Sequence, residues 1–196
     1  PESEAERQQL RRLLPRLHRK LGLPRPPTPP AARPEVLHLT LPPAASVEQA
    51  VALALATSEA PVHYVENSLL PGLFGLLFWD AIFAPVPGAF FHPFQSGPAD
   101  LHHPEFRRRR QAGFDAGFQA LANGEHRARI LARYRQKFGR LSPFVHWGRL
   151  SEALLAQALD CLPAEHLALC FERLLADIAA NLAGLPDLIQ FWPAQR

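Results

Sequence analysis

Asp187 is the acidic residue whose position in the sequence most clearly suggests chemistry. It follows an alanine-rich run that predicts a helix and precedes the apolar run 188–192, which predicts a strand. A carboxylate at the start of a buried strand costs free energy unless a partner compensates its charge. Because divalent cations are common partners of such acids, we expect Asp187 to take part in metal chemistry.

The segment 84–104 offers a second set of metal-ligating side chains. It is a long loop with five prolines, and it carries His92, Asp100, His102 and His103. Their spacing matches no ligand pattern with a clear mechanism, so surface or loop-packing positions are the expected role of the histidines. A metal hydrolase that uses them stays open as an alternative. Long ordered loops in compact domains are often functional, which makes the whole segment a candidate.

The basic residues are unevenly distributed. The net charge is +3, yet residues 105–149 hold eleven Lys/Arg against three acids and residues 34–103 hold no Lys or Arg. Two basic segments around a neutral one suggest a polyanionic partner. Either a solvated basic surface or contact with a nucleic-acid backbone explains them, and the candidates for phosphate contact are Arg107, Arg108, Arg109, Arg110, Arg127, Arg133 and Lys137.

Hydrophobic periodicity predicts a mostly helical chain. A helix over 2–23 should be kinked or split by Pro15, and a proline-rich connector leads to a short strand over 35–41. Ser46 and Gln49 form a capping-box pattern. Further helices are expected over 47–57, 62–83, 105–122, 125–138, 151–162 and 163–183, before the strand that follows Asp187.

Two composition features bound the class of protein. Cys161 and Cys170 have no zinc-ligand spacing, so we interpret them as reduced core cysteines, which weakly favours an intracellular protein. No apolar run reaches the roughly 18 residues that span a bilayer, so no membrane partner is expected.

Two stretches together resemble the Fanconi-associated nuclease family, whose catalytic domain is of the VRR-NUC type. One is "VENSLLPGLFGLLFWDAIFAPVPGAFFHPFQSGPADL" over 65–101, and the other is "AGLPDLIQFW" over 183–192. The order and separation of these two anchors make the resemblance specific. "VHWGRLSEALLAQALDCLP" over 145–163 stands where the family has a tryptophan followed by a helix.

The resemblance implies a metal-dependent phosphodiesterase with a PD-(D/E)xK active site. Such enzymes cut 5′ flaps and trim 5′ ends of branched DNA in interstrand crosslink repair. The resemblance assigns Asp187 and Glu66 as catalytic residues and ligands of Mg²⁺ or Mn²⁺, and we expect their carboxylates to lie within about 10 Å of each other, close enough to share one ion. An ordinary acid at a helix start is the alternative for Glu66.

The family pattern also requires a Glu-x-Lys strand, which does not follow Asp187 in this sequence. We therefore expect a fragment, inactive alone, whose partner is the remaining C-terminal part of the same nuclease domain. Arginines that hold a 5′ phosphate in animal members are not found before "GLPDL", which suggests a bacterial member. Its location is then cytoplasmic and nucleoid-associated, or nuclear if the source is eukaryotic.

The expected fold class is mainly α, a helical region leading into the start of a restriction-endonuclease-like α/β core. Residues 1–44 would end a preceding helical domain with its linker, and residues 45–196 would begin the nuclease domain. Asp80, Gln95 and Asp100 are expected to be structural, with Asp80 bonding the following loop. A non-catalytic helical DNA-binding module is the alternative function.

Overall fold

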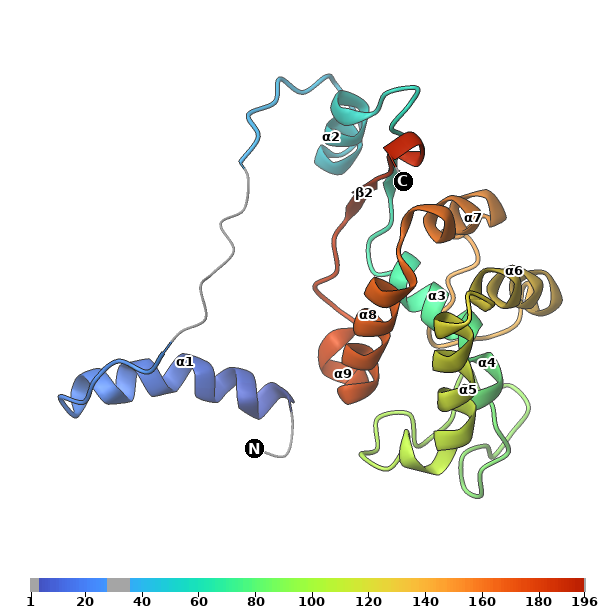
Figure 1. Cartoon of the computed structure of the whole chain (residues 1–196), viewed down its shortest axis with the longest axis horizontal. Coiled ribbons are helices and arrows are strands. Elements are labelled where there is room, and N and C mark those ends of the chain that lie inside the picture. Colours follow the sequence, from blue (N-terminus) through green and yellow to red (C-terminus); the bar gives the residue numbers. More distant parts are fainter. Residues whose placement is uncertain (1–3, 28–35, 196) are drawn as a thin grey trace. The chain divides into compact units, whose positions relative to one another are not determined.

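The structure, a computed structural model, describes residues 4–27 and 36–195 (Figure 1). Its internal contacts divide the chain into two units, Pro1–Thr40 and Leu41–Arg196. In the first unit, helix α1 (Glu4–Lys20) runs through Pro15 without the expected split. The expected strand over 35–41 does not form: residues 36–41 are exposed and irregular, and residue 35 lies outside the described part.

The second unit is mainly helical with one small sheet. Strands β1 (Val62–Tyr64) and β2 (Leu188–Gln190) pair antiparallel, with Tyr64 opposite Leu188. The remaining elements are α2 (Val47–Leu55), α3 (Leu69–Leu77), α4 (Trp79–Ile82), η1 (Arg108–Arg110), α5 (Gln111–Ala122), α6 (His126–Lys137), α7 (Glu152–Cys161), α8 (Ala164–Ala176), α9 (Ile178–Asn181) and η2 (Pro193–Gln195).

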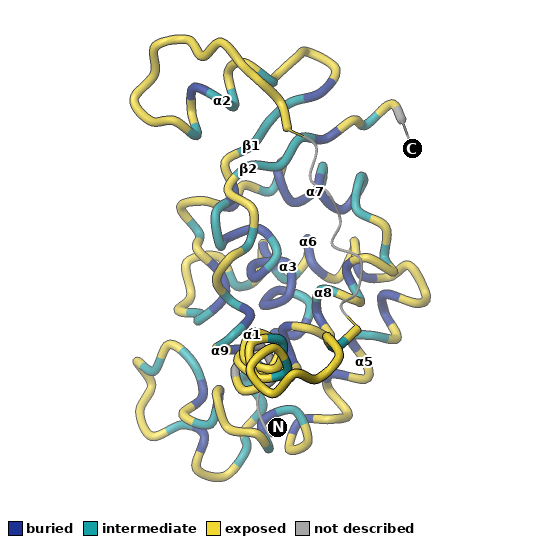
Figure 2. The backbone as a smooth tube through the Cα atoms, turned by 90° about the vertical axis from the view of Figure 1, so that its left-hand side faces the viewer, coloured by how far each residue is buried: buried dark blue, intermediate teal, exposed yellow. Residues whose placement is uncertain are grey.

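Helix α3 lies at the centre of the core, and Figure 2 shows it among the buried segments. The Phe74 ring contacts the rings of Phe114, Phe144 and Phe171 at centroid distances of 4.9–6.4 Å. A Cβ on Gly75 would lie 2.6 Å from the Phe144 side chain, so only glycine permits this approach of the two segments. Burial of these rings fixes α3, and with it the turn that precedes it.

Three expected helices begin or end elsewhere. The helix expected over 62–83 starts after β1 and is interrupted at Phe78, whose ring packs against Phe114 and Phe118. The helix expected from residue 105 starts as the 3₁₀ turn η1, and α5 begins at Gln111. The last helix divides where Asp177 adopts an extended conformation and accepts a hydrogen bond from the Ala180 amide.

The two predicted serine caps are confirmed. Ser46 and Ser151 cap α2 and α7 by accepting hydrogen bonds from the amides of Gln49 and Leu154. Cys161 and Cys170 are both free thiols. Among the described helices, none alone has the length and apolar character to cross a membrane; only α7 and α8 taken together do, and they are bent by 110°.

Candidate metal and nucleic-acid site

The β1–β2 ladder brings the two expected metal ligands together. The Val65 amide donates to the Asp187 carbonyl oxygen at 2.8 Å, which extends the ladder by one pair beyond Tyr64 and Leu188. Glu66 is therefore offset by one residue from Asp187 on the neighbouring segment. Directly opposite residues in such a hydrogen-bonded pair have Cα atoms about 5.5 Å apart. Segments separated by 120 residues in the sequence thus place the backbones of Glu66 and Asp187 at the same end of the sheet. The expected distance of at most about 10 Å between their carboxylates stays a prediction.

A tight turn holds Glu66 between β1 and α3, rather than on a helix as the sequence suggested. Ser68 donates through both its amide and its hydroxyl to the Val65 carbonyl, each at 2.9 Å. Asn67 adopts φ 45°, a left-handed conformation that is unusual for a residue other than glycine. Neither Asn67 nor Ser68 caps α3 with its side chain, so the turn is held by Ser68 and by packing.

Glu66 has two neighbours that sequence reasoning did not identify. The Tyr64 hydroxyl donates to Glu66 Oε2, and this bond raises the pKa of Tyr64 above its ordinary value. Arg149 Nη1 lies 3.3 Å from the Glu66 carbonyl oxygen and 3.7 Å from Glu66 Oε2. The Arg149 guanidinium also lies 5.7 Å from the centroid of the Tyr64 ring. Glu66 is therefore oriented and partly neutralised before any cation binds.

Asp187 has a different environment. Its side chain is exposed, so the expected burial of this carboxylate is wrong. The turn before β2 leaves it at the surface, and within the described residues its carboxylate has no hydrogen bond or ion pair. An exposed carboxylate without a protein partner keeps its oxygen atoms available for an external ligand.

The donor set suits a hard cation. Mg²⁺ and Mn²⁺ prefer oxygen ligands, and Mg²⁺ often uses one or two carboxylates while keeping several waters. Next to Glu66, the Asn67 Oδ1 atom is buried and lacks a hydrogen-bond partner in the described part of the chain. No cluster of three or more His, Cys, Asp or Glu suited to a metal occurs among the described residues. Glu66 and Asp187 thus fit a partial oxygen site, and the loop histidines do not form a site of their own.

The arginine run 107–110 is largely engaged within the protein. Arg110 is buried, makes two hydrogen bonds to Asp100 at 2.8 and 2.9 Å, and lies over the Phe106 ring. Arg109 bonds Asp100 and the Pro87 carbonyl. Arg107 makes a bidentate pair with Glu172. The phosphate-contact role expected for Arg110 is therefore wrong, because its guanidinium is buried and forms an ion pair with Asp100 inside the fold.

The other basic candidates stay at the surface. The Arg108 side chain is 79% exposed and pairs with Glu105. Arg127 pairs with Asp160 at 3.2 Å, and Lys137 lies 6.0 Å from the Trp79 ring centroid. Arg133 bonds Gln136 at 2.8 Å and pairs with Asp80. A role of these four side chains in DNA binding stays a prediction.

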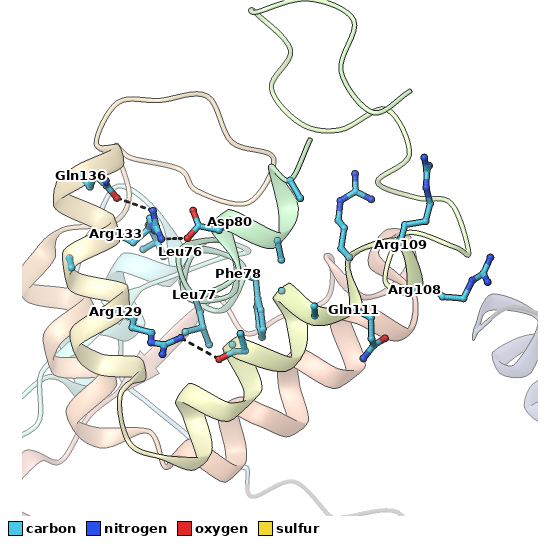
Figure 3. A pocket seen from close by; sticks show the side chains of 18 residues that line it. Leu76, Leu77, Phe78, Asp80, Arg108, Arg109, Gln111, Arg129, Arg133 and Gln136 are labelled. Carbon is cyan, nitrogen blue, oxygen red and sulfur yellow. Dashed lines mark hydrogen bonds and ion pairs between the residues drawn. The ribbon is translucent and has the colours of Figure 1, made fainter. Parts of the chain in front are cut away.

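Figure 3 shows the groove of about 680 Å³ that several of these arginines line. Its floor consists of small residues of α4, α5 and α6, including Gly113 and Gly117. Arg108 and Arg109 stand at one side, and Arg129 and Arg133 at the other. The groove therefore has positive charge along both sides, and its arginines are held in place by ion pairs with acidic side chains.

Gln95 and Asp100 are the structural anchors that the sequence indicated. Gln95 Nε2 donates to the carbonyls of Ala89 and Gly97 at 2.9 and 2.8 Å, and Asp100 holds Arg109 and Arg110. Hydrogen bonds from Arg110 are the main cause that lowers the pKa of Asp100. Asp80 differs from expectation: it pairs with Arg133 of α6 instead of the following loop.

Comparison with known proteins identifies the family of this chain. The VRR-NUC domain matches residues 121–196. The Fanconi-associated nuclease 1 homolog of Pseudomonas aeruginosa is 61% identical over 201 residues, covering 100% of this chain and 36% of the relative. The chain belongs to the Fanconi-associated nuclease family. Its relative from Schizosaccharomyces pombe is 34% identical over 135 residues, covering 68% of this chain and 19% of the relative.

Two solved structures of the family superpose on the whole chain. One is described as paFAN1 bound to 2nt 5′ flap DNA with gap (60% identity, TM-score 0.88), and the other as the same protein bound to 1nt 5′ flap DNA with gap (61% identity, TM-score 0.86). This chain spans 36% and 37% of those chains. It therefore corresponds to about a third of the length of these family members, and a bacterial membership fits.

Proposed function

We propose that this chain supplies the Asp187 and Glu66 part of the active site of a structure-selective, metal-dependent DNA nuclease. The observation that supports this most directly is the ladder bond between the Val65 amide and the Asp187 carbonyl. It joins the two family motifs at the end of one sheet. The ladder would then begin a restriction-endonuclease-like α/β core.

The chemistry follows from the residues at this edge. A bound Mg²⁺ or Mn²⁺ supplies charge neutralisation at the phosphate and lowers the pKa of a bound water. Glu66 and Asp187 would hold that ion, with Tyr64 fixing the Glu66 carboxylate through its hydroxyl. Arg149 lies beside Glu66 and adds positive charge where a phosphate would approach.

The proposed substrate is branched DNA with a 5′ flap, cut endonucleolytically or trimmed from the 5′ end. The flap DNA in the two superposed family structures supports this choice. Exposed Arg108 and Arg127, and half-buried Lys137, are suited to backbone contacts that carry no sequence information. Crosslink repair in a bacterial cytoplasm, at the nucleoid, is the proposed cellular role.

A non-catalytic DNA-binding module is the second candidate. It is favoured by exposed basic side chains such as Arg108 and Arg127, which need no metal to contact a phosphate backbone. Such a module would bind DNA without metal, with an affinity that falls steeply as salt rises. The two candidates therefore differ in the response to Mn²⁺.

A cleavage assay on a labelled 5′-flap duplex with Mn²⁺ tests the proposal. It compares this chain, the chain joined to a family segment that carries the Glu-x-Lys strand, and Asp187→Asn in the joined form, with Asp80→Asn as the matched control. We expect cleavage in the joined form and its loss in Asp187→Asn only. Cleavage that survives Asp187→Asn would overturn the proposal, and DNA binding without cleavage in any form would favour the module.

A further inference from the structure

The loop between α4 and α5 presents two aromatic side chains to solvent. Phe91 is 75% exposed and Phe94 is 80% exposed. These rings add little to the hydrophobic core, and exposed large apolar groups that gather at one place mark interaction sites. The loop lies at the other end of the second unit from the β1–β2 ladder (Figures 1 and 2). It is therefore a surface distinct from the metal site.

The backbone of this loop is fixed although its tip is exposed. Gln95 Oε1 accepts from the Phe91 amide at 3.0 Å, while Gln95 Nε2 holds the carbonyls of Ala89 and Gly97. The Ala99 amide donates to the Ala89 carbonyl at 2.8 Å. Arg109 holds the Pro87 carbonyl at 2.6 Å. A loop held this closely exposes its rings in a defined arrangement, which lowers the entropy cost of binding.

A groove of about 760 Å³ lies beside these rings. Three aromatic rings form a stacked row along it: Trp79 stacks on Phe83 with centroids 4.7 Å apart, and Phe83 stacks on Phe90 at 6.0 Å. Phe91 extends the lining at the exposed end. Trp79 is buried and the stacked rings largely cover one another's faces, so the free aromatic faces beside the groove are those of Phe91 and Phe94. Nucleobases stack on such exposed rings, and this stacking tolerates every base.

The charges of the groove match a phosphate backbone. Lys137 and Arg140 line it, and the lining residues, all of them described, include no carboxylate. Lys137 has no ion pair among the described residues, in contrast with Arg107, Arg109 and Arg110. Unpaired cations beside stacked rings favour a ligand that combines anionic and aromatic groups. A purely apolar partner would leave both cations without partners.

We propose that this groove, formed by Trp79, Phe83, Phe90, Phe91, Lys137 and Arg140, binds unpaired nucleotides of a single DNA strand. Phe94 stands beside it as an additional stacking surface. The inference rests on the proposed function only in taking DNA as the substrate, since the groove needs no metal. It gives the protein a site for the unpaired part of a branched substrate, separate from the site of cleavage.

Binding is measured without metal, in EDTA, using a single-stranded oligonucleotide of about ten nucleotides that carries 2-aminopurine. Stacking quenches the fluorescence of this base, whereas purely electrostatic binding does not. The variants are Phe91→Ala with Phe94→Ala, Phe91→Trp with Phe94→Trp, and Lys137→Gln. Leu169→Ala, an equally exposed apolar side chain on α8, is the matched control.

We expect the double alanine variant to lose the quenching and to bind about 5- to 150-fold more weakly, the value of one stacked base. The double tryptophan variant should retain both signals, and Leu169→Ala should equal the wild type. Failure of the nuclease proposal would appear only in the Mn²⁺ cleavage assay. Equal binding and quenching in the double alanine variant would overturn the groove assignment, as would wild-type binding without quenching. Loss of self-association in that variant, with DNA binding unchanged, would assign the rings to a protein partner.

Discussion

Asp100 and Asp187 show two different uses of an aspartate in one fold. The Asp100 side chain is 10% exposed and holds two arginines, one of them fully buried. Asp187 is exposed, and only its backbone carbonyl is engaged among the described residues. An acid that is saturated by protein partners stabilises a loop, whereas an acid held in place by its backbone alone can serve a ligand. We therefore predict that Asp100 is structural and that the Asp187 carboxylate is available to a ligand.

The largest expected effect is that of Asp100→Asn. It leaves Arg110 as a buried charge without a counter-ion, which costs about 3–5 kcal/mol in the free energy of unfolding. Urea denaturation followed by circular dichroism measures the change. Glu152→Gln, which breaks the exposed pair with Arg135, is the control and should leave the free energy of unfolding nearly unchanged. Equal losses in the two variants would contradict the contrast between buried and exposed pairs.

Lowering the pH should destabilise the protein through the buried pair of Asp100 and Arg110. The pKa of Asp100 is lowered from its ordinary value of 3.8, mainly by hydrogen bonds from Arg110. The folded state thus binds fewer protons than the unfolded state near that pH. The stabilisation is present above the ordinary pKa and is lost as the pH falls through the lowered pKa. We expect the urea denaturation midpoint to fall with falling pH in the wild type and in Asp187→Asn. The midpoint of Asp100→Asn should depend less on pH.

A smaller effect is expected at the candidate metal site of Glu66 and Asp187. Tyr64→Phe removes the hydroxyl that orients Glu66, and loss of such outer partners weakens metal affinity about 10- to 100-fold. A Mn²⁺ titration measures it. Tyr134→Phe is the matched control, because its hydroxyl bonds the Leu150 carbonyl in the core. Unchanged Mn²⁺ affinity in Tyr64→Phe would show that the hydrogen bond has no role in the site.

The smallest effect is that of Asp187→Asn on stability. Its exposed carboxylate has no side-chain partner in the described part of the chain, so the free energy of unfolding should change by no more than about 0.5 kcal/mol. The same denaturation experiment tests this. A loss as large as that of Asp100→Asn would mean that Asp187 is structural, and the comparison between the two acids would fail.

Local chemistry predicted the parts of the fold that depend on neighbouring residues. The serine caps and the strand after Asp187 follow from adjacent sequence, and the family motifs indicated Glu66 and Asp187. The strand expected over 35–41 is not seen in its described part, residues 36–41, which are exposed and have no ladder partner among the described residues. Tyr64 and Arg149 were missed since only the fold brings Arg149 to Glu66, 83 residues away.

The arginine run illustrates the same limit. Its composition indicated a basic surface, yet Arg110 is buried against Asp100, ten residues earlier, and Arg107 meets Glu172 on α8. A count of charges along the sequence does not reveal which arginines form ion pairs with acids elsewhere in the fold. The interruption at Phe78 and the division at Asp177 likewise occur inside stretches that are helical by periodicity, where tertiary packing and a local cap decide the ends.

The most direct test is whether these two acids share one ion. Electron paramagnetic resonance measures Mn²⁺ binding to Glu66→Gln, Asp187→Asn and the double variant. Asp80→Asn serves as an exposed acidic control. If the ion is shared, each single variant should lose as much affinity as the double variant, because the two losses are coupled. Losses that add independently, or wild-type binding in either single variant, would contradict the shared site.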